Sequence, residues 1–143
     1  MGNLILKGRP ALGPAAEGHA LVCPDSILGW AAVDYYTGEI TEVGNSNRGK
    51  SIKNTVLVLP FWKGSLGWSD YFLACHIHKC GPVAYVFTKM DSKGGTTVAL
   101  ANVPCVADFA EDSDPCRMLK SGDYIRVDGI DGTVEVLKKA EEQ

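Results

Sequence analysis

Two short runs of almost entirely apolar residues, with a helical segment between them, constrain the fold of this chain more than any other feature. Residues 55–59 (TVLVL) and 83–87 (VAYVF) are bounded by turn-forming residues, and such runs are typical of strands buried on both faces of a sheet. Between them, Ser69 is suited to cap a helix, Lys79 to lie in its last turn, and Pro82 to prevent its continuation. This order predicts a right-handed crossover that pairs the two strands in parallel.

Shorter β-branched runs predict more strands around this unit. They cover residues 19–23, 39–43, 104–107, 124–128 and 133–137. Residues 129–132 (GIDG) are a good hairpin turn, and weaker helical turns are expected at 92–100 and 114–119. Because the chain has no internal repeat or linker, we expect a single domain over residues 1–143, of mixed α/β class, largely β with a few helices.

Charge and composition exclude several classes of partner. The net charge is −3, and Lys and Arg do not cluster beyond Lys138 and Lys139, so we expect neither nucleic acid nor a membrane surface as a partner. No apolar run approaches the roughly 18 residues that a membrane span needs, and the N-terminus lacks a signal-peptide pattern. The five cysteines, an odd number, predict reduced and mostly buried thiols. We therefore expect a cytoplasmic protein.

Residues 44–51 (GNSNRGKS) match the phosphate-binding pattern G-x-x-x-x-G-K-[ST]. That pattern binds phosphate when a helix begins directly after its lysine. Here Lys50 is followed within a few residues by the predicted strand 55–59. We interpret the motif as a polar loop between two strands.

Residues 75–80 (CHIHKC) bring two cysteines and two histidines together in sequence. On a helix, neighbouring side chains point about 100° apart and residues five positions apart diverge. We therefore predict no metal site in this segment, a buried Cys75, and histidines that face solvent.

Ser65 lies in a loop between the predicted strand 55–59 and the predicted helix. A serine-hydrolase elbow requires Gly two residues before the serine, where this chain has Lys63. A loop at the carboxyl end of a buried strand is nevertheless where open α/β sheets bind ligands. The backbone amides of Gly64, Ser65 and Leu66 would point into that crevice. With the helix N-terminus and the Lys63 charge, they would attract an anion or stabilise a deprotonated serine; the alternative is a tight turn without function.

The order of motifs along nearly the whole chain is similar to that of the small subunit of the aconitase X family. The motifs are GHALV at 18–22, VD at 33–34 with TG at 37–38, GKSI at 49–52, VLVLP at 56–60, KGS at 63–65, GPVA at 81–84, and GD at 122–123 with VDG at 127–129. The chain departs from the family pattern at three places. Lys63 replaces the usual Arg, residues 66–69 are bulkier than the usual small residues, and Asn45 lies where many relatives have His-Pro.

The resemblance implies a fold, a reaction and a partner. In this family the subunit is the swivelling β/β/α domain that aconitases carry as their last domain. The serine that accepts a proton maps onto Ser65, and Lys63, Gly64 and Leu66 become substrate-binding residues. The implied reaction is elimination of water from a small hydroxy acid such as mevalonate 5-phosphate or cis-3-hydroxyproline. A large partner subunit is expected to hold an iron–sulfur cluster that acts on the leaving hydroxyl. This chain alone is expected to bind no metal, although a contact between Cys23 and the cluster stays open.

Two other functions remain as alternatives. Residues 94–97 (GGTT) and 103–106 (VPCV) are similar to the phosphohistidine swivelling domain of phosphoenolpyruvate-utilising enzymes. That domain needs a histidine shortly after its threonine, and Thr97 is followed by Val98 and Ala99. The other alternative is a non-catalytic binding module. The chain's tryptophans, at positions 30, 62 and 68, belong either to a partner interface or to the core.

Overall fold

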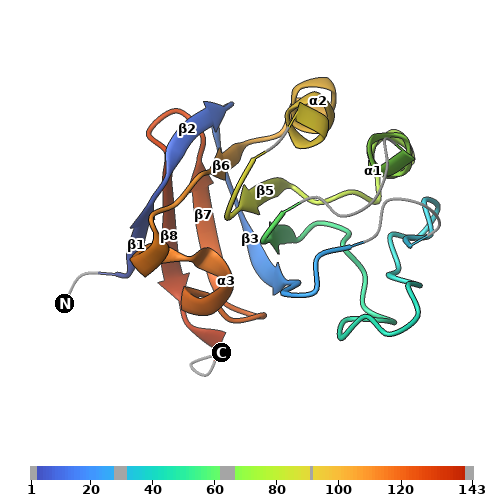
Figure 1. Ribbon diagram of the computed structural model, residues 1–143, viewed down its shortest axis with the longest axis horizontal. Helices are drawn as coiled ribbons and strands as arrows, with labels where there is room; N and C mark the ends of the chain where they lie inside the picture. Colours follow the sequence, from blue (N-terminus) through green and yellow to red (C-terminus); the bar gives the residue numbers. More distant parts are fainter. Residues whose placement is uncertain (1–2, 28–31, 62–66, 91, 141–143) are drawn as a thin grey trace.

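The computed structural model describes residues 3–27, 32–61, 67–90 and 92–140. Its described strands all join one sheet, in the order β1-β8-β7-β3-β4-β5-β6-β2 (Figure 1). The strands are β1 (Ile5–Lys7), β2 (Arg9–Leu12), β3 (Ala15–Val22), β4 (Val56–Leu59), β5 (Ala84–Phe87), β6 (Cys105–Ala107), β7 (Tyr124–Asp128) and β8 (Thr133–Lys138). The helices are α1 (Gly67–Ile77), α2 (Ser92–Ala101) and α3 (Pro115–Met118), with a 3₁₀ turn, η1 (Glu111–Ser113), before α3.

The predicted strand–helix–strand unit lies at the centre of the molecule. β4 and β5 pair in parallel, with Leu59 opposite Phe87, and α1 lies between them in sequence. Successive residues of β4 face opposite sides of the sheet, so Val56 and Val58 join one apolar cluster while Leu57 and Leu59 join the other. All four are fully buried. The prediction of a parallel pair buried on both faces is confirmed.

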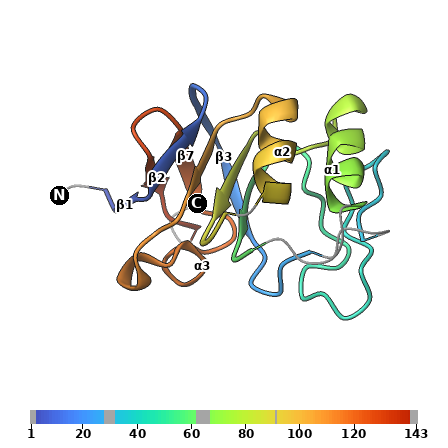
Figure 2. The ribbon, with the colours of Figure 1, turned by 45° about the horizontal axis from the view of Figure 1, so that its top comes forward.

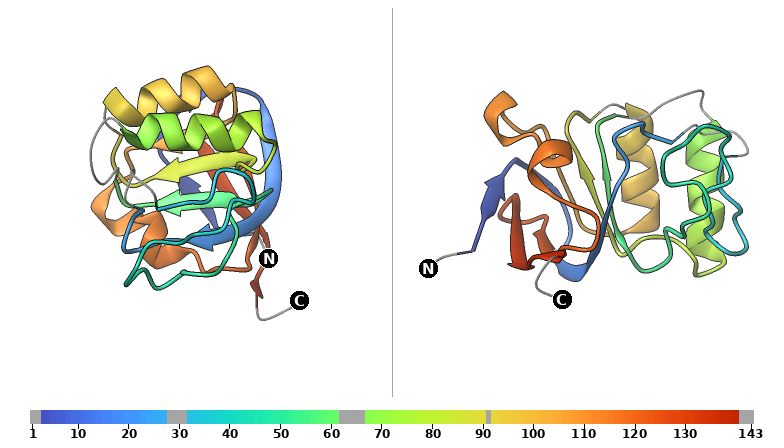
Figure 3. Two further views of the ribbon diagram at one scale, coloured as in Figure 1. Left: turned by 90° about the vertical axis from the view of Figure 1, so that its right-hand side faces the viewer. Right: turned by 90° about the horizontal axis from the view of Figure 1, so that it is seen from below.

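Helices cover one face of the parallel strands, and antiparallel strands pack on the other. α1 and α2 lie side by side over β4 and β5 (Figures 2 and 3). On the far side, β7, β8 and β1 form the antiparallel part of the sheet, close to α3 (Figure 3). β3 belongs to both parts, since its first five residues pair antiparallel with β7 and its last three residues pair in parallel with β4. The structure is therefore the mixed α/β fold that the sequence predicted.

The two ends of the sheet are joined by a short piece of continuous chain. β1 pairs with β8 and β2 pairs with β6, at opposite ends of the strand order, and only Gly8 separates β1 from β2. The Gly8 amide donates to the carbonyl of Gly132 at 2.9 Å. A Cβ at Gly8 would lie 2.8 Å from the carbonyl oxygen of Ala107 and 2.8 Å from a methyl group of Val106. A residue without a side chain is therefore required where the chain passes between the two ends.

Several predicted elements differ from the structure. Residues 39–43 form no strand, only isolated bridges from Ile40 to Val33 and from Glu39 to Ser51. α1 begins at Gly67, so the prediction that Ser69 caps it is wrong. β1 and β2 were not predicted, because Gly8 between them and Pro10 within β2 argue against strands, and pairing with distant segments forms them.

Most of the remaining element predictions are confirmed, but α1 ends at Ile77, so Lys79 lies after its last turn and not in it. α2 covers the predicted residues 92–100, and α3 lies within 114–119 with Asp114 as its N-cap. β7 and β8 form the predicted hairpin. No helix in the described part of the chain is long and apolar enough to span a bilayer.

Candidate active site

The carboxyl ends of β3, β4 and β5 lie next to one another at one edge of the sheet. Parallel pairing continues past the strands, since the Cys23 amide donates to the carbonyl of Val58 at 2.9 Å. On the other side of β4, the Thr88 amide donates to Leu59 at 3.0 Å and the Lys89 amide to Pro60 at 3.1 Å. This is the edge at which open α/β sheets bind ligands. Residues 62–66 connect this end of β4 with α1.

The predicted site residues Lys63, Gly64, Ser65 and Leu66 lie outside the described residues. Their assigned roles therefore stay predictions. The structure describes the chain up to Phe61 before them and from Gly67 after them. Two of the tryptophans, at 30 and 62, also lie outside the described residues, and the third lies in the first turn of α1.

One side of this edge is formed by residues 23–27 and 44–50, which are joined by polar contacts. The Ser26 hydroxyl donates to the carbonyl of Phe61 at 2.5 Å, and the Asn45 amide group donates to the carbonyl of Ser26 at 2.9 Å. Asn47 donates to the carbonyl of Val22 at 2.9 Å. No helix follows Lys50, so the interpretation of the phosphate-like motif as a polar loop is confirmed.

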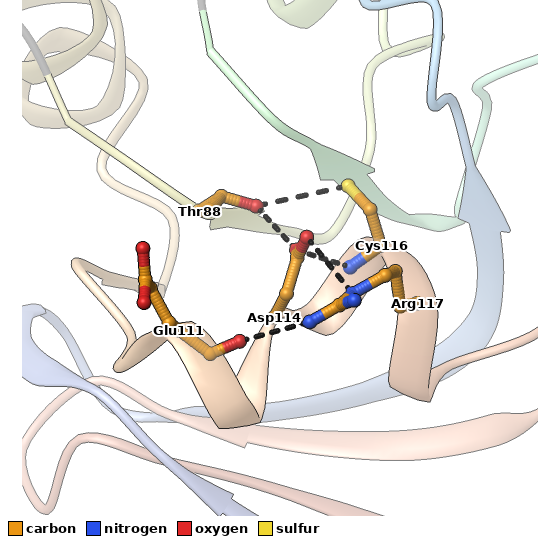
Figure 4. Close-up of polar contacts among 5 residues, drawn as sticks. All are labelled: Thr88, Glu111, Asp114, Cys116 and Arg117. Atoms are coloured by element: carbon orange, nitrogen blue, oxygen red, sulfur yellow. Dashed lines mark hydrogen bonds and ion pairs between the residues drawn. The ribbon is translucent and has the colours of Figure 1, made fainter.

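The other side is formed by the residue after β5 and by the start of α3 (Figure 4). The Thr88 hydroxyl donates to Asp114 Oδ1 at 2.9 Å, and the same oxygen accepts the amide of Cys116 at 3.0 Å. Arg117 Nε lies 3.7 Å from Asp114 Oδ2, and its Nη2 donates to the carbonyl of Glu111 at 3.0 Å. Asp114 therefore both caps α3 and fastens it to the end of β5.

A cavity of about 630 Å³ opens beside this cluster. Its walls are Thr88, Lys89, Phe109, Ala110, Glu111, Asp114 and Arg117. The lining carries two cationic and two acidic side chains, and Arg117 is already engaged by Asp114. The cavity can admit a small polar molecule next to the end of β5, but its lining has no excess of either charge.

The segment 75–80 is partly as predicted. Cys75 is fully buried and His78 is exposed, but His76 is half-buried and its Nε2 lies 2.9 Å from the Tyr85 hydroxyl. Burial lowers the pKa of His76 from its ordinary value of 6.5. The prediction that both histidines face solvent is therefore wrong for His76.

The prediction that Cys75 and Cys80 diverge is also wrong. α1 ends at Ile77, and Lys79 adopts a positive φ of 60°, so the chain turns back. The Cys80 amide donates to the carbonyl of Cys75 at 2.8 Å, and the two thiols share a hydrogen bond. This is a Schellman helix end, in which the first residue after the turn packs on the last helical turn.

Burial favours the protonated form of four of the five thiols, whereas an iron–sulfur cluster is bound by cysteine thiolates. Burial raises the pKa of Cys23, Cys75 and Cys105 to about 12 and that of Cys116 to about 11. Cys23, for which a cluster contact stayed open, is fully buried. In the described ranges, no group of at least three His, Cys, Asp or Glu side chains could hold a metal ion.

Sequence reasoning missed Ser26 and the Thr88–Asp114 pair. Both contacts join segments far apart in sequence, 35 residues for Ser26 and Phe61 and 26 for Thr88 and Asp114. Asp114 did carry a signal, since Asp before Pro115 is typical of a helix N-cap followed by N1 proline. Ser26 carried none, because a serine in a polar segment is ordinary.

The fold and the location of this edge define the chain as a swivelling domain of the aconitase type. A family model described as "Aconitase X swivel domain" matches residues 5–136, and the chain belongs to this family. The holo-form crystal structure of aconitase X from Thermococcus kodakaraensis superposes with a TM-score of 0.86 at 32% identity, covering 94% of this chain and 99% of that one.

Curated relatives point to one kind of enzyme subunit. The phosphomevalonate dehydratase small subunit of Methanosarcina mazei is 35% identical over 96% of this chain and 94% of its own length. The protein of the same description from Thermococcus kodakarensis is 34% identical over 95% of this chain and 98% of its own length. The family and fold expected from the sequence motifs are thereby confirmed.

Proposed function

We propose that this chain is the small subunit of a heteromeric hydro-lyase that removes water from mevalonate 5-phosphate, and that Ser65 is its proton acceptor. The observation that carries the proposal is the similarity to phosphomevalonate dehydratase small subunits along almost their entire length. The position of residues 62–66 between the carboxyl end of β4 and α1 supports it, because ligands bind at this edge in open α/β sheets.

The proposed reaction is a β-elimination. Ser65, in its deprotonated form, takes the proton from the carbon beside the substrate carboxylate. The electron pair of that C–H bond forms the new double bond, the β-hydroxyl leaves with its electron pair, and a proton completes the water molecule. Lys63 and the amides of Gly64 and Leu66 bind substrate charge and stabilise the serine alkoxide.

The proposal includes a large partner subunit that carries the iron–sulfur cluster. The buried, protonated thiols described above support a cluster ligated outside this chain. We also assign residues 1–143 to one swivelling domain. The free cysteines support a location in the cytoplasm, where thiols stay reduced. cis-3-Hydroxyproline is the competing substrate.

Coexpression with a large aconitase X subunit under anaerobic conditions tests the proposal. The purified complex should dehydrate mevalonate 5-phosphate in preference to cis-3-hydroxyproline. Ser65→Ala should lower kcat by about 10²–10⁴-fold, which is the usual contribution of a general base, while the complex stays intact on size-exclusion chromatography. Ser113→Ala, which removes a hydroxyl bonded only to the neighbouring Asp112 among the described contacts, is the control.

Three results would overturn the assignment. Full turnover by Ser65→Ala would exclude the serine as proton acceptor. A complex that forms but dehydrates neither substrate would favour a non-catalytic module, and phosphorylation of the chain by phosphoenolpyruvate-dependent enzymes would favour the carrier alternative.

A further inference from the structure

Ser26 makes a partly buried hydrogen bond just after the end of β4, and its own backbone conformation is unfavourable. Ser26 is fully buried, and its φ is +61°, in the left-handed region that residues with a side chain rarely adopt. Its hydroxyl donates to the carbonyl of Phe61 at 2.5 Å. Strained backbone of this kind persists when surrounding contacts hold it, and it is concentrated at functional sites.

The contacts that hold Ser26 come from the loop at 44–47. The side-chain amide of Asn45, itself only 6% exposed, donates to the carbonyl of Ser26 at 2.9 Å. Asn45 Oδ1 in turn accepts the backbone amide of Asn47, whose side-chain amide donates to the carbonyl of Val22. A chain of hydrogen bonds, all buried except the partly buried last one, thus leads from this loop through Ser26 to Phe61.

Three successive carbonyl groups at the end of β4 are bound from two sides. Leu59 and Pro60 accept amides from the strand extension after β5. The third carbonyl, that of Phe61, accepts the Ser26 hydroxyl instead. The Phe61 side chain is 51% exposed, so packing restrains it little. Among the contacts of the described residues, the Ser26 hydroxyl is therefore the one that holds the carbonyl of Phe61, the last described residue before residues 62–66.

We propose that Ser26 is a positioning residue for the dehydratase reaction, acting through the Phe61 carbonyl with Asn45 as its support. The inference rests on the proposed function, because Ser65 follows Phe61 by four residues. A displacement of about 1 Å at a reacting group can cost roughly 10²-fold in rate. Loss of the Ser26 hydroxyl therefore lowers turnover without removing any group that touches substrate.

Two variants of Ser26 separate the hydroxyl from the backbone strain. Ser26→Ala removes the hydroxyl and keeps a side chain at positive φ, whereas Ser26→Gly removes the hydroxyl and relieves the strain. Both should lower kcat/KM of the anaerobic complex by about tenfold or more, although Ser26→Gly should be the more stable protein. Thr55→Val is the matched control, because its hydroxyl donates to the carbonyl of Ile52 at 2.7 Å at the opposite end of β4.

The pH profile of kcat/KM distinguishes positioning from a merely structural role. Partial loss of folded complex scales the profile equally at every pH. Displacement of the proton acceptor from its donors also moves the pH at which the rate is half-maximal. We expect such a movement in both Ser26 variants and in Asn45→Ala, and none in Thr55→Val.

The outcomes are separable from those of the proposed function. If Ser65→Ala is inactive but both Ser26 variants match Thr55→Val in rate and profile, Ser26 is not a positioning residue. If the Ser26 variants lose rate with an unmoved profile, the role is structural and the inference is wrong. If Ser65→Ala is fully active, the proposed function itself fails, whatever the Ser26 variants do.

Discussion

The imidazole of His76 is half-buried against the hydroxyl of Tyr85, a residue that is itself fully buried. Burial disfavours the charged imidazolium, which is why the pKa of His76 is lowered. The unfolded chain binds a proton at its ordinary pKa of about 6.5. Above that pH both states are neutral and the folded state keeps its full stability. As pH falls below it, the unfolded state gains protons that the folded state resists, and stability is lost.

His76→Gln should therefore weaken the pH dependence of folding. The glutamine can still bond to Tyr85 but cannot become charged. We expect the free energy of unfolding of the unsubstituted chain to fall between pH 7.5 and pH 5, and that of His76→Gln to fall less. Urea titrations followed by circular dichroism measure the free energy of unfolding at both pH values. An equal decrease in the two proteins between pH 7.5 and pH 5 would show that His76 makes no such contribution.

Tyr85→Phe is the companion variant. It removes the hydroxyl but leaves the ring that buries His76. We therefore expect the free energy of unfolding to fall by about 1 kcal/mol at both pH values. The pH dependence should remain that of the unsubstituted chain.

Single residues were predictable where the local pattern decides them. Cys75 lies within an apolar helical run, and its burial followed from that. The approach of Cys80 to Cys75 depends instead on a positive φ at Lys79, a conformation for which glycine is the usual signal. The contact of Ser26 with Phe61 depends on the arrangement of distant loops, which the local sequence does not encode.

Among the helices, α3 is too short to be stable by itself, so side-chain contacts must stabilise it. It has four residues, and an isolated helix of that length does not form in water. Asp114 caps it through the Cys116 amide and accepts the Thr88 hydroxyl from the end of β5. A single carboxylate thus fixes one wall of the cavity beside the candidate active site.

Asp114→Ala should destabilise the protein by about 1–2 kcal/mol, the range observed for lost N-caps. Asp114→Asn keeps an acceptor oxygen for both contacts and should cost less. Guanidinium unfolding measures the difference, with Asp112→Ala as the control, since Asp112 is exposed in the preceding η1 turn. Equal effects of Asp114→Ala and Asp112→Ala would show that the cap contributes nothing.

The elements that the sequence predicted well are those whose own residues determine them. Residues 55–59 and 83–87 are too apolar to lie anywhere but inside a sheet, and β4 and β5 pair as expected. Residues 39–43 have a strand-like pattern but form only isolated bridges. β1 and β2 have weak patterns of their own and become strands by pairing with β8 and β6.

In the whole molecule, closure of the sheet depends on Gly8. Gly8→Ala places a methyl group against the Ala107 carbonyl and the Val106 side chain, so the ends of the sheet must move apart. Overpacking of this kind costs about 1–3 kcal/mol. Thermal unfolding should show a lowered Tm, and hydrogen exchange should be faster in β1 and β2 than in β4 and β5.

Gly44→Asn is the matched control for this glycine. Position 44 has a positive φ of 85°, a Cβ added there would meet no atom within 4 Å, and Asn tolerates that φ. Its Tm should change little. A Tm for Gly8→Ala equal to that of Gly44→Asn would show that the structure accommodates a methyl group at position 8.

At the scale of the whole molecule, the location of the candidate site could be predicted from the sequence, but the residues that surround it could not. The crossover unit determined that residues 62–66 would leave the carboxyl end of a parallel strand. The walls around that point come from residues 23–27, 44–50, 88–89 and 110–117. Their meeting depends on the complete strand order, which includes two strands that no local pattern indicates.

The pairing of β1 with β8 also bears on biosynthesis. Ile5 lies opposite Glu135 and Lys7 opposite Thr133, so segments about 130 positions apart must meet. During translation the earlier partner leaves the ribosome long before the later one exists. The central parallel strands and α1 can assemble while synthesis continues, but β1 can pair with β8 only after residues 133–135 have emerged. Ribosome-bound nascent chains that stop before β8 will therefore leave β1 without its partner.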